Sequence, residues 1–408
     1  MNHSRHITTA RLGRWLPSDP KHLNDWLKKA IDAAEQKEGK APFHPVVEEF
    51  RTMIENDPEM YMYFTQMFEQ QAHFPPPPGS GDVKLKNYQQ MLVVINHLLT
   101  SAPEFNTTGM VGCPINAILD FPMITRAGLA AFLSPKVNVM LKKVLQVWAE
   151  YLDSPASRSV LNPSENGWLC PAALKALEMD DFIYDPKAPY FGFRSWNDFF
   201  IRQFKPGVRP VAEPDNNKVV VSACESAPFA ISTNAKEHDR FWLKSQPYSL
   251  RHMLDGLFVG EFVDGTVYQA FLSPENYHRW HSPVSGTIKK IHKVEGTYYS
   301  EAASEGFDPV GPNNSQGYIA HTATRALIFI DADGPIGLMC FIAVGMAEVS
   351  SCVITVEENR KVKKGDQIGY SNLADRATAL SSGKVLFRNL PHRRYHRDPV
   401  EQIPQSSR

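Results

Sequence analysis

Two histidines three positions apart, His278 and His281, stand in the stretch YHRWHS (residues 277–282). Histidine can transfer protons near neutral pH or bind a metal ion. In an extended strand the two rings would point to opposite faces, whereas a turn would bring both rings to one pocket. The turn-forming residues SPEN just before them favour the turn. The remaining interpretation is structural, with two hydrogen-bonded histidines at a strand end.

Metal binding is the weakest of these interpretations. The H-x-x-H spacing has no third ligand nearby, and no cysteine or carboxylate follows at the spacing of a zinc site. We therefore expect no metal here.

Two further stretches contain residues that could take part in chemistry. Glu225 is the one acid in the stretch SACES (222–226), where an acid either caps a turn or orients a partner such as a histidine. Residues 282–299 resemble the hairpin of a biotinyl or lipoyl carrier. Such a carrier needs a lysine at an exposed hairpin tip, and Lys289 and Lys290 stand in mid-strand, so we interpret this stretch as β-structure only.

The composition is that of a soluble globular protein, with 43% hydrophobic and 21% charged residues. A formal net charge of −1 argues against a nucleic-acid partner. No apolar run is long enough for a membrane span, although a peripheral membrane contact stays open. Five scattered cysteines without a CxxC pair predict a cytoplasmic protein. The basic, acid-free first eighteen residues leave a mitochondrial location as the alternative.

Hydrophobic periodicity divides the chain. Residues 1–19 are expected to be a flexible N-terminus, and residues 20–180 carry helical periodicity, interrupted by the connector FPPPPGSG. Short β-branched runs bounded by turn residues follow, including KVVVSACES (218–226), RALIFID (325–331) and SCVITVEE (351–358). The fold class predicted is α+β, with a helical N-terminal region and a catalytic domain of short antiparallel strands, sandwich-like or barrel-like, over residues 181–370. The polar, basic residues 371–408 are predicted to be a disordered tail.

Three stretches together resemble the phosphatidylserine decarboxylase family. YFGFRSWNDFFIRQFKPGVRPV (190–211) is similar to the family signature F-x-S-x-x-x-F-F-x-R followed by K-P-G-x-R-P. YHRWHSPVSG (277–286) matches its Y-H-R-x-H-x-P-x-x-G motif, and FIAVGMAEVSSC (341–352) resembles its core strand V-G-x-x-x-V-G-S. The resemblance covers about residues 185–370, with the motifs in the family's order.

The helical N-terminal half points to a subgroup, the fungal L-tryptophan decarboxylases that act on free amino acids. VVEEFRTMIENDPEMYMYFTQMFEQ (46–70), MITRAGLAAFLSPKVNVMLKKVL (123–145) and GWLCPAAL (167–174) are similar to their N-terminal extension. Glu225 also stands where the lipid enzymes usually have Asp.

The resemblance implies a carboxy-lyase that makes its own cofactor by autocatalytic cleavage of a zymogen. A serine attacks the preceding carbonyl, and the new chain begins with a pyruvoyl group, so neither a metal nor PLP is needed. Carried over, His281 would be the base and Glu225 its acid partner, and His278 would protonate the carbon left by CO₂. The substrate implied is a free, tryptophan-like amino acid in specialised metabolism. The alternative is phosphatidylserine, converted to phosphatidylethanolamine.

The pyruvoyl-forming serine departs from the family pattern. The family places a Gly-Ser element shortly after G-D-x-I-G, and here that place is taken by ADRATAL (374–380). Ser381 and Ser382 follow Leu380, although a residue without Cβ suits the strained turn. Three explanations stay open: an altered reading frame after Tyr370, the use of Ser381 or Ser382 with a changed loop, or an unprocessed, non-catalytic homologue.

Overall fold

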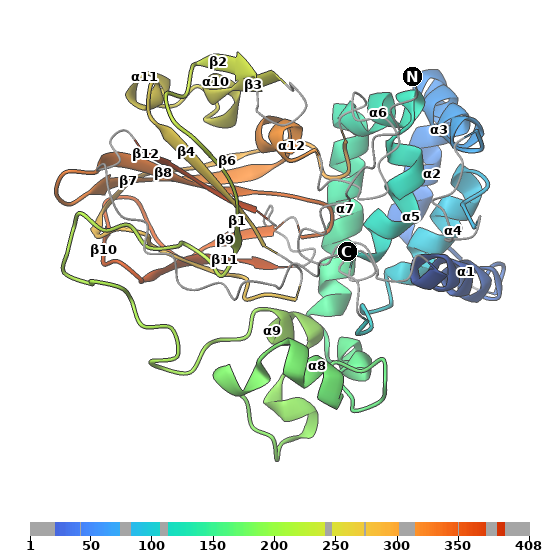
Figure 1. Ribbon diagram of the computed structural model, residues 1–408. Helices are drawn as coiled ribbons and strands as arrows, with labels where there is room; N and C mark the ends of the chain where they lie inside the picture. Colours follow the sequence, from blue (N-terminus) through green and yellow to red (C-terminus); the bar gives the residue numbers. More distant parts are fainter. Residues whose placement is uncertain are drawn as a thin grey trace, which may run out of the picture.

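The computed structural model describes residues 21–40, 42–73, 83–106, 113–240, 247–272, 275–301, 315–349, 351–372 and 382–387. The predicted N-terminus 1–19, the connector FPPPPGSG (74–81) and residues 373–381 and 388–408 of the predicted tail, Ser381 among them, lie outside these ranges. The described part is α+β, as predicted, with the helices on one side and the sheets on the other (Figure 1).

The N-terminal part of the chain is helical. Several helices begin at a side chain that accepts a backbone N–H of the first turn, as Asp57 does for Met60 and Asn87 for Gln90. Proline in the first turn adds to the same signal, because its missing N–H is unpaired there anyway. The helices are α1 (Lys21–Glu35), α2 (Pro45–Asn56), α3 (Pro58–Gln71), α4 (Tyr88–Leu98), α5 (Pro114–Met123), α6 (Arg126–Leu133), α7 (Pro135–Leu152) and α8 (Pro171–Ala176).

Short helical turns lead from this region to the sheets. These are the 3₁₀ turns η2 (Pro155–Val160), η3 (Met179–Asp181) and η4 (Pro189–Gly192), followed by α9 (Trp196–Phe200). Three further short helices, α10 (Leu250–Met253), α11 (Val259–Phe262) and α12 (Gln316–Thr322), lie within the β-rich part. Among the residues that the structure describes, no helix is long and apolar enough to cross a membrane.

The larger sheet has seven strands in the order β1-β4-β12-β8-β7-β6-β10, all paired antiparallel. It is open, with β1 and β10 at its edges, so the sandwich rather than the barrel is the correct description. The strands are β1 (Ala227–Ser232), β4 (Thr266–Phe271), β6 (Gly286–Val294), β7 (Arg325–Ala332), β8 (Gly337–Val344), β10 (Lys361–Val362) and β12 (Ser382–Phe387).

A second, three-stranded sheet lies below the first in Figure 1, in the order β5-β11-β9. Trp280 of the smaller sheet packs on Phe341 of the larger one, with ring centroids 5.6 Å apart. The strands are β5 (Arg279–His281), β9 (Ser351–Ile354) and β11 (Gln367–Asn372), and a separate ribbon joins β2 (His238–Arg240) to β3 (Pro247–Ser249).

Two sequence predictions about strands need correction. Residues 218–226, all described, form no strand, because their backbone makes only isolated bonds such as Val221 N–H to the Pro283 carbonyl. The predicted disordered tail from residue 371 is wrong for residues 382–387, which form the strand β12 between β4 and β8. Val385 and Leu386 are both buried there, and the free energy of burying them outweighs the polar character of their neighbours.

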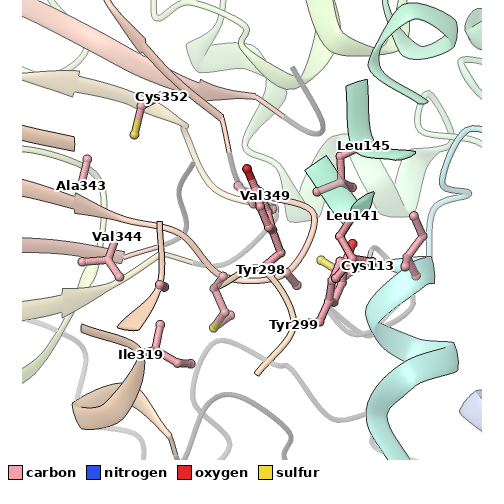
Figure 2. Packing of buried hydrophobic residues seen from close by; sticks show 14 of the residues in the cluster. Cys113, Leu141, Leu145, Tyr298, Tyr299, Ile319, Ala343, Val344, Val349 and Cys352 are labelled. Atoms are coloured by element: carbon pink, nitrogen blue, oxygen red, sulfur yellow. The ribbon is translucent and has the colours of Figure 1, made fainter. Parts of the chain in front are cut away.

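Helix α7 connects the two halves of the protein (Figure 1). Asn138 Oδ1 accepts the backbone N–H of Tyr298 at 3.1 Å, and Lys142 pairs with Glu295 at 2.6 Å. Figure 2 shows Leu141 and Leu145 of this helix in the same packed cluster as Tyr298, Tyr299 and Val349 from the β-rich part. One continuous apolar core therefore joins the halves.

Candidate active site

The segment with the two histidines is held by the motif that precedes it in the chain. Arg202, which is 4% exposed, donates through Nη2 to the carbonyl of Glu275 at 2.8 Å. In return, Arg279 donates through Nε to the carbonyl of Ile201 at 2.8 Å. These charge-assisted bonds give a physical reason for finding the two motifs together, since each arginine satisfies a carbonyl of the other segment.

Aromatic stacking adds to this contact. The ring of His278 stacks on Phe200, with centroids 4.1 Å apart and planes inclined by 20°. The ring of Tyr277 lies on Phe204 at 4.1 Å. The aromatic residues of the 196–204 segment therefore form the surface on which the histidine segment rests.

The two histidines have different ring partners, and only the second lies within a strand, β5. The ring of His278 stacks on Phe200, whereas the ring of His281 lies by Tyr277, with ring centroids 5.7 Å apart. Each histidine consequently has its own environment.

His281 is held at both ring nitrogens. Nδ1 is 2.7 Å from the carbonyl of Gly365, and Nε2 is 2.8 Å from the hydroxyl of Tyr277. A carbonyl only accepts, so Nδ1 carries the proton of the neutral ring and Nε2 accepts from Tyr277. Burial lowers the pKa of His281 below its usual value, against the opposite effect of the Gly365 bond. The ring is therefore neutral near pH 7, with a lone pair at Nε2 that can take a proton.

His278 is fully buried, and its position is fixed by the backbone as well as by its ring. Its carbonyl accepts the N–H of Ser371, in β11, at 2.8 Å. The strand register places Asn372 opposite Ser351 at the same end of the smaller sheet. His278 thus lies at the end of this sheet where β9 begins.

Glu225 lies near His281 but contacts another residue. The backbone N–H of His281 donates to the Ala223 carbonyl at 2.8 Å, which brings the SACES segment beside the histidine. The Glu225 carboxylate accepts from Arg209 Nε at 2.7 Å, and Arg209 also contacts Asp181 at 2.7 Å. In the described part of the chain, the group that orients His281 Nδ1 is the Gly365 carbonyl, in the place that the resemblance assigned to Glu225.

Tyr277 is the residue that sequence reasoning missed. Burial is the main cause that raises its pKa to about 12, and the Glu225 charge raises it further while Arg279 lowers it. Its hydroxyl therefore stays protonated and donates to His281. The spacing alone could not predict this contact, because β5 begins at Arg279 and residues four apart in an extended strand lie about 13 Å apart.

The candidate serines differ in what the structure describes. Ser381 lies outside the described residues. Ser382 is the first residue of β12, and its backbone stands between Phe271 of β4 and Val344 of β8. The strand that carries the candidate serine is therefore central in the larger sheet.

Two buried acceptor atoms without partners lie in segments connected to the strands around Ser382. Among the described residues, Glu348 Oε2, in the turn after β8, and Asn372 Oδ1, at the end of β11, are buried without a hydrogen-bond partner. Glu348 follows β8, whose Val344 pairs with Ser382, and Asn372 pairs with Ser351 of β9, the strand after that turn. Buried polar atoms without partners are costly, and they are typical of sites that receive a further group.

The other chemical interpretations receive no geometric support. In the part of the chain that the structure describes, no three His, Cys, Asp or Glu side chains are grouped so that they could hold a metal ion. Lys289 lies over the ring of Phe258, and Lys290 pairs with Glu358 at 2.9 Å, both within β6 rather than at a hairpin tip.

Comparison with known proteins agrees with these features. Two family models, both described as phosphatidylserine decarboxylase, match residues 44–177 and 196–375. The "Decarboxylase iboD" of Amanita muscaria is 39% identical over 71% of this chain and 92% of the relative. The "L-tryptophan decarboxylase" of Psilocybe cubensis is 36% identical over 83% of this chain and 80% of the relative.

A phosphatidylserine decarboxylase proenzyme of Schizosaccharomyces pombe is 36% identical over 45% of this chain and 18% of its own length. The matches extend over both the helical region and the sheets with the histidine segment. The protein belongs to the phosphatidylserine decarboxylase family and is a decarboxylase of that family.

Proposed function

We propose that this protein removes CO₂ from a free amino acid with an aromatic, tryptophan-like side chain, in fungal specialised metabolism. The observation that carries the proposal is the extent of the similarity. The tryptophan decarboxylase of Psilocybe cubensis matches 83% of the chain, including the helical region, whereas the phosphatidylserine decarboxylase proenzyme of Schizosaccharomyces pombe matches 45%. The helical region is thus shared with a relative named for a free amino acid.

The proposal includes a pyruvoyl group generated from Ser381 or Ser382. The pairing of β12 on both sides supports this position, because a strand between Phe271 and Val344 holds the start of the new chain inside the sheet. Its fit into the sheet also supports a correct reading frame through Phe387. When bound, the group supplies a carbonyl that withdraws electrons from the substrate.

The chain's own residues supply proton transfer. His281 is neutral and oriented through Nδ1 by the Gly365 carbonyl, as a general base must be, and Tyr277 covers its Nε2. His278 is fully buried and stacks on Phe200, and the proposal assigns to it the protonation of the carbon left by CO₂. Glu225 stabilises the hydrogen-bonded Tyr277 hydroxyl in its protonated form.

The test is to incubate the purified protein separately with L-tryptophan, L-phenylalanine, L-serine and phosphatidylserine vesicles, and to measure released CO₂. Release from L-tryptophan, with tryptamine as the product, is the expected result. Mass spectrometry should find a C-terminal peptide that begins with a pyruvoyl group at position 381 or 382.

The variants Ser381→Ala and Ser382→Ala identify the serine, because only one of them should remain uncleaved. Turnover of the vesicles alone would replace the proposal with phosphatidylserine decarboxylation. An uncleaved wild-type chain that releases no CO₂ would identify a non-catalytic homologue.

A further inference from the structure

Glu348 is a fully buried acid in the turn that follows β8. The turn is tightly held, since Gly345 N–H donates to the Thr324 carbonyl at 2.8 Å and Ala347 N–H donates to the Tyr298 carbonyl at 3.2 Å. Buried carboxylates are rare unless paired. The position of this acid therefore calls for a specific partner.

That partner is the beginning of helix α5. Glu348 Oε1 accepts the backbone N–H of Asn116 at 2.8 Å, across 232 positions of the chain. The N-cap residue of α5, Cys113, makes no capping hydrogen bond through its own side chain. Glu348 thus satisfies a free N–H of the first turn and places a carboxyl at the positive end of the helix dipole.

The surroundings of Glu348 are polar but incompletely paired. Within the described residues, Glu348 Oε2, the side-chain amide of Asn116 and the hydroxyl of Tyr299 are buried without hydrogen-bond partners. Figure 2 shows Tyr299 next to Cys113, and the charge of Glu348 raises the pKa of both groups in addition to their burial. Such a cluster costs stability, so its presence favours a functional role.

The turn joins two strands that border the candidate active site. Before the turn, Val344 pairs with Ser382, the first residue of the strand that carries the candidate serine. After it, Ser351 pairs with Asn372, whose neighbour Ser371 donates its N–H to the His278 carbonyl. A displacement of the turn would therefore also move the backbone at Ser382 and at the His278 carbonyl.

We propose that Glu348 is a positioning residue of the decarboxylase, which holds the turn 345–349, and with it the start of β12, against the N-terminus of α5. The helical region thereby becomes part of the active-site support rather than a separate appendage. The activity readouts rest on the proposed function, whereas the placement of the turn can be measured without it.

The strength of the contact between Glu348 and the N-terminus of α5 should depend on pH. Burial raises the pKa of Glu348 to about 7, against the opposite effect of the bond from the Asn116 backbone. The titratable groups that interact with it are Cys113, the N-cap residue of α5, and Tyr299 of the segment before α12, and burial keeps the pKa of each above its usual value. Glu348 is thus the group of this cluster that ionises near neutral pH.

The experiment compares Glu348→Ala, which removes the cap, with Glu348→Gln, which keeps an acceptor oxygen but no charge. The control is Glu358→Gln, because Glu358 also accepts a backbone N–H, from Ile291 at 3.1 Å, at the protein surface. Hydrogen exchange of the full-length protein is followed by mass spectrometry. Glu348→Ala should speed exchange about five- to tenfold at the start of α5 and in residues 382–387.

The second readout is the pH profile of kcat/KM for the substrate that the wild type turns over. The ratio of wild type to Glu348→Gln should approach one below pH 6 and fall above pH 8, because glutamine mimics the protonated acid whereas burial disfavours the ionised one. Glu348→Ala should lower kcat more than it raises KM.

The outcomes are separable. Unchanged exchange in residues 382–387, or the same change in Glu358→Gln, overturns the positioning role whether or not the enzyme is active. A ratio that does not vary with pH also overturns it. A wild type that acts on none of the substrates refutes the proposed function, while the exchange result still decides the role of Glu348.

Discussion

At the scale of single residues, the candidate site depends on His281 and the two groups that contact its ring. The Gly365 carbonyl selects the tautomer, and Tyr277 donates to the nitrogen that would act as a base. Glu225, expected as the direct partner, instead pairs with Arg209 near Tyr277. The proton acceptor is thus oriented by a neutral backbone group, so the positive charge that His281 gains with a proton is not balanced by a hydrogen-bonded carboxylate.

Replacing Tyr277 with phenylalanine removes the donor at His281 Nε2. The neutral ring then loses a hydrogen bond, so the pKa of His281 should rise. The protein should also become less stable, with a free energy of unfolding lower by about 1 kcal/mol. Because the wild-type pKa lies below 6.5, the protein loses stability as the pH falls below that value, and Tyr277→Phe should reduce this loss.

Histidine NMR titrations and urea unfolding at several pH values measure both effects. Tyr184→Phe is the control, because that hydroxyl donates to the exposed side chain of Asp180 at 3.0 Å. An unchanged His281 titration in Tyr277→Phe would contradict the assigned donor.

At the scale of elements, a glycine turn between β10 and β11 delivers the carbonyl that orients His281. Gly365 has a φ of +89°, and a Cβ on this residue would lie 2.4 Å from Val211 Cγ2. Both the backbone conformation and the close approach require glycine. The turn, the RPV segment and β5 therefore form one assembly around His281.

Gly365→Ala should destabilise the protein and lower kcat, because the turn must shift and the Gly365 carbonyl moves with it. Gly207→Ala is a matched control, with a φ of +86° and nothing within 4 Å of the added Cβ. We expect a loss of about 1 kcal/mol for Gly207→Ala from the backbone alone, and roughly 2–4 kcal/mol for Gly365→Ala. Urea unfolding and steady-state kinetics provide the measurements, and equal losses in the two variants would rule out the clash with Val211.

At the scale of the whole molecule, the helical region and the sheets meet through buried contacts. Lys142 and Asn138 of α7 contact the 295–298 segment, and Glu348 contacts α5. Because the contact between Glu348 and α5 involves a buried ionisable group, the stability of the whole protein should change near neutral pH.

A carboxyl whose pKa is raised in the folded state from 4.5 to about 7 favours folding when protonated. Its contribution is largest below pH 4.5 and is lost as the pH rises to about 7, with a total on the order of 3 kcal/mol. The difference in unfolding free energy between wild type and Glu348→Gln, measured in urea from pH 5 to pH 8, should follow this change. A difference that stays constant over this range would show that Glu348 does not titrate there.

The sequence by itself determined the α+β class, the family and the residues of the histidine segment, since periodicity and short motifs are local properties of the chain. It also contained one further signal, a lone acid, Glu348, in an otherwise apolar stretch. Only the tertiary structure decided that Tyr277 and Gly365 hold the ring of His281, that residues 382–387 enter the sheet and that Glu348 caps α5. The physical reason is that these contacts join residues far apart in the chain. Their free energy comes from burial and from satisfying backbone groups elsewhere in the fold, which no local pattern specifies.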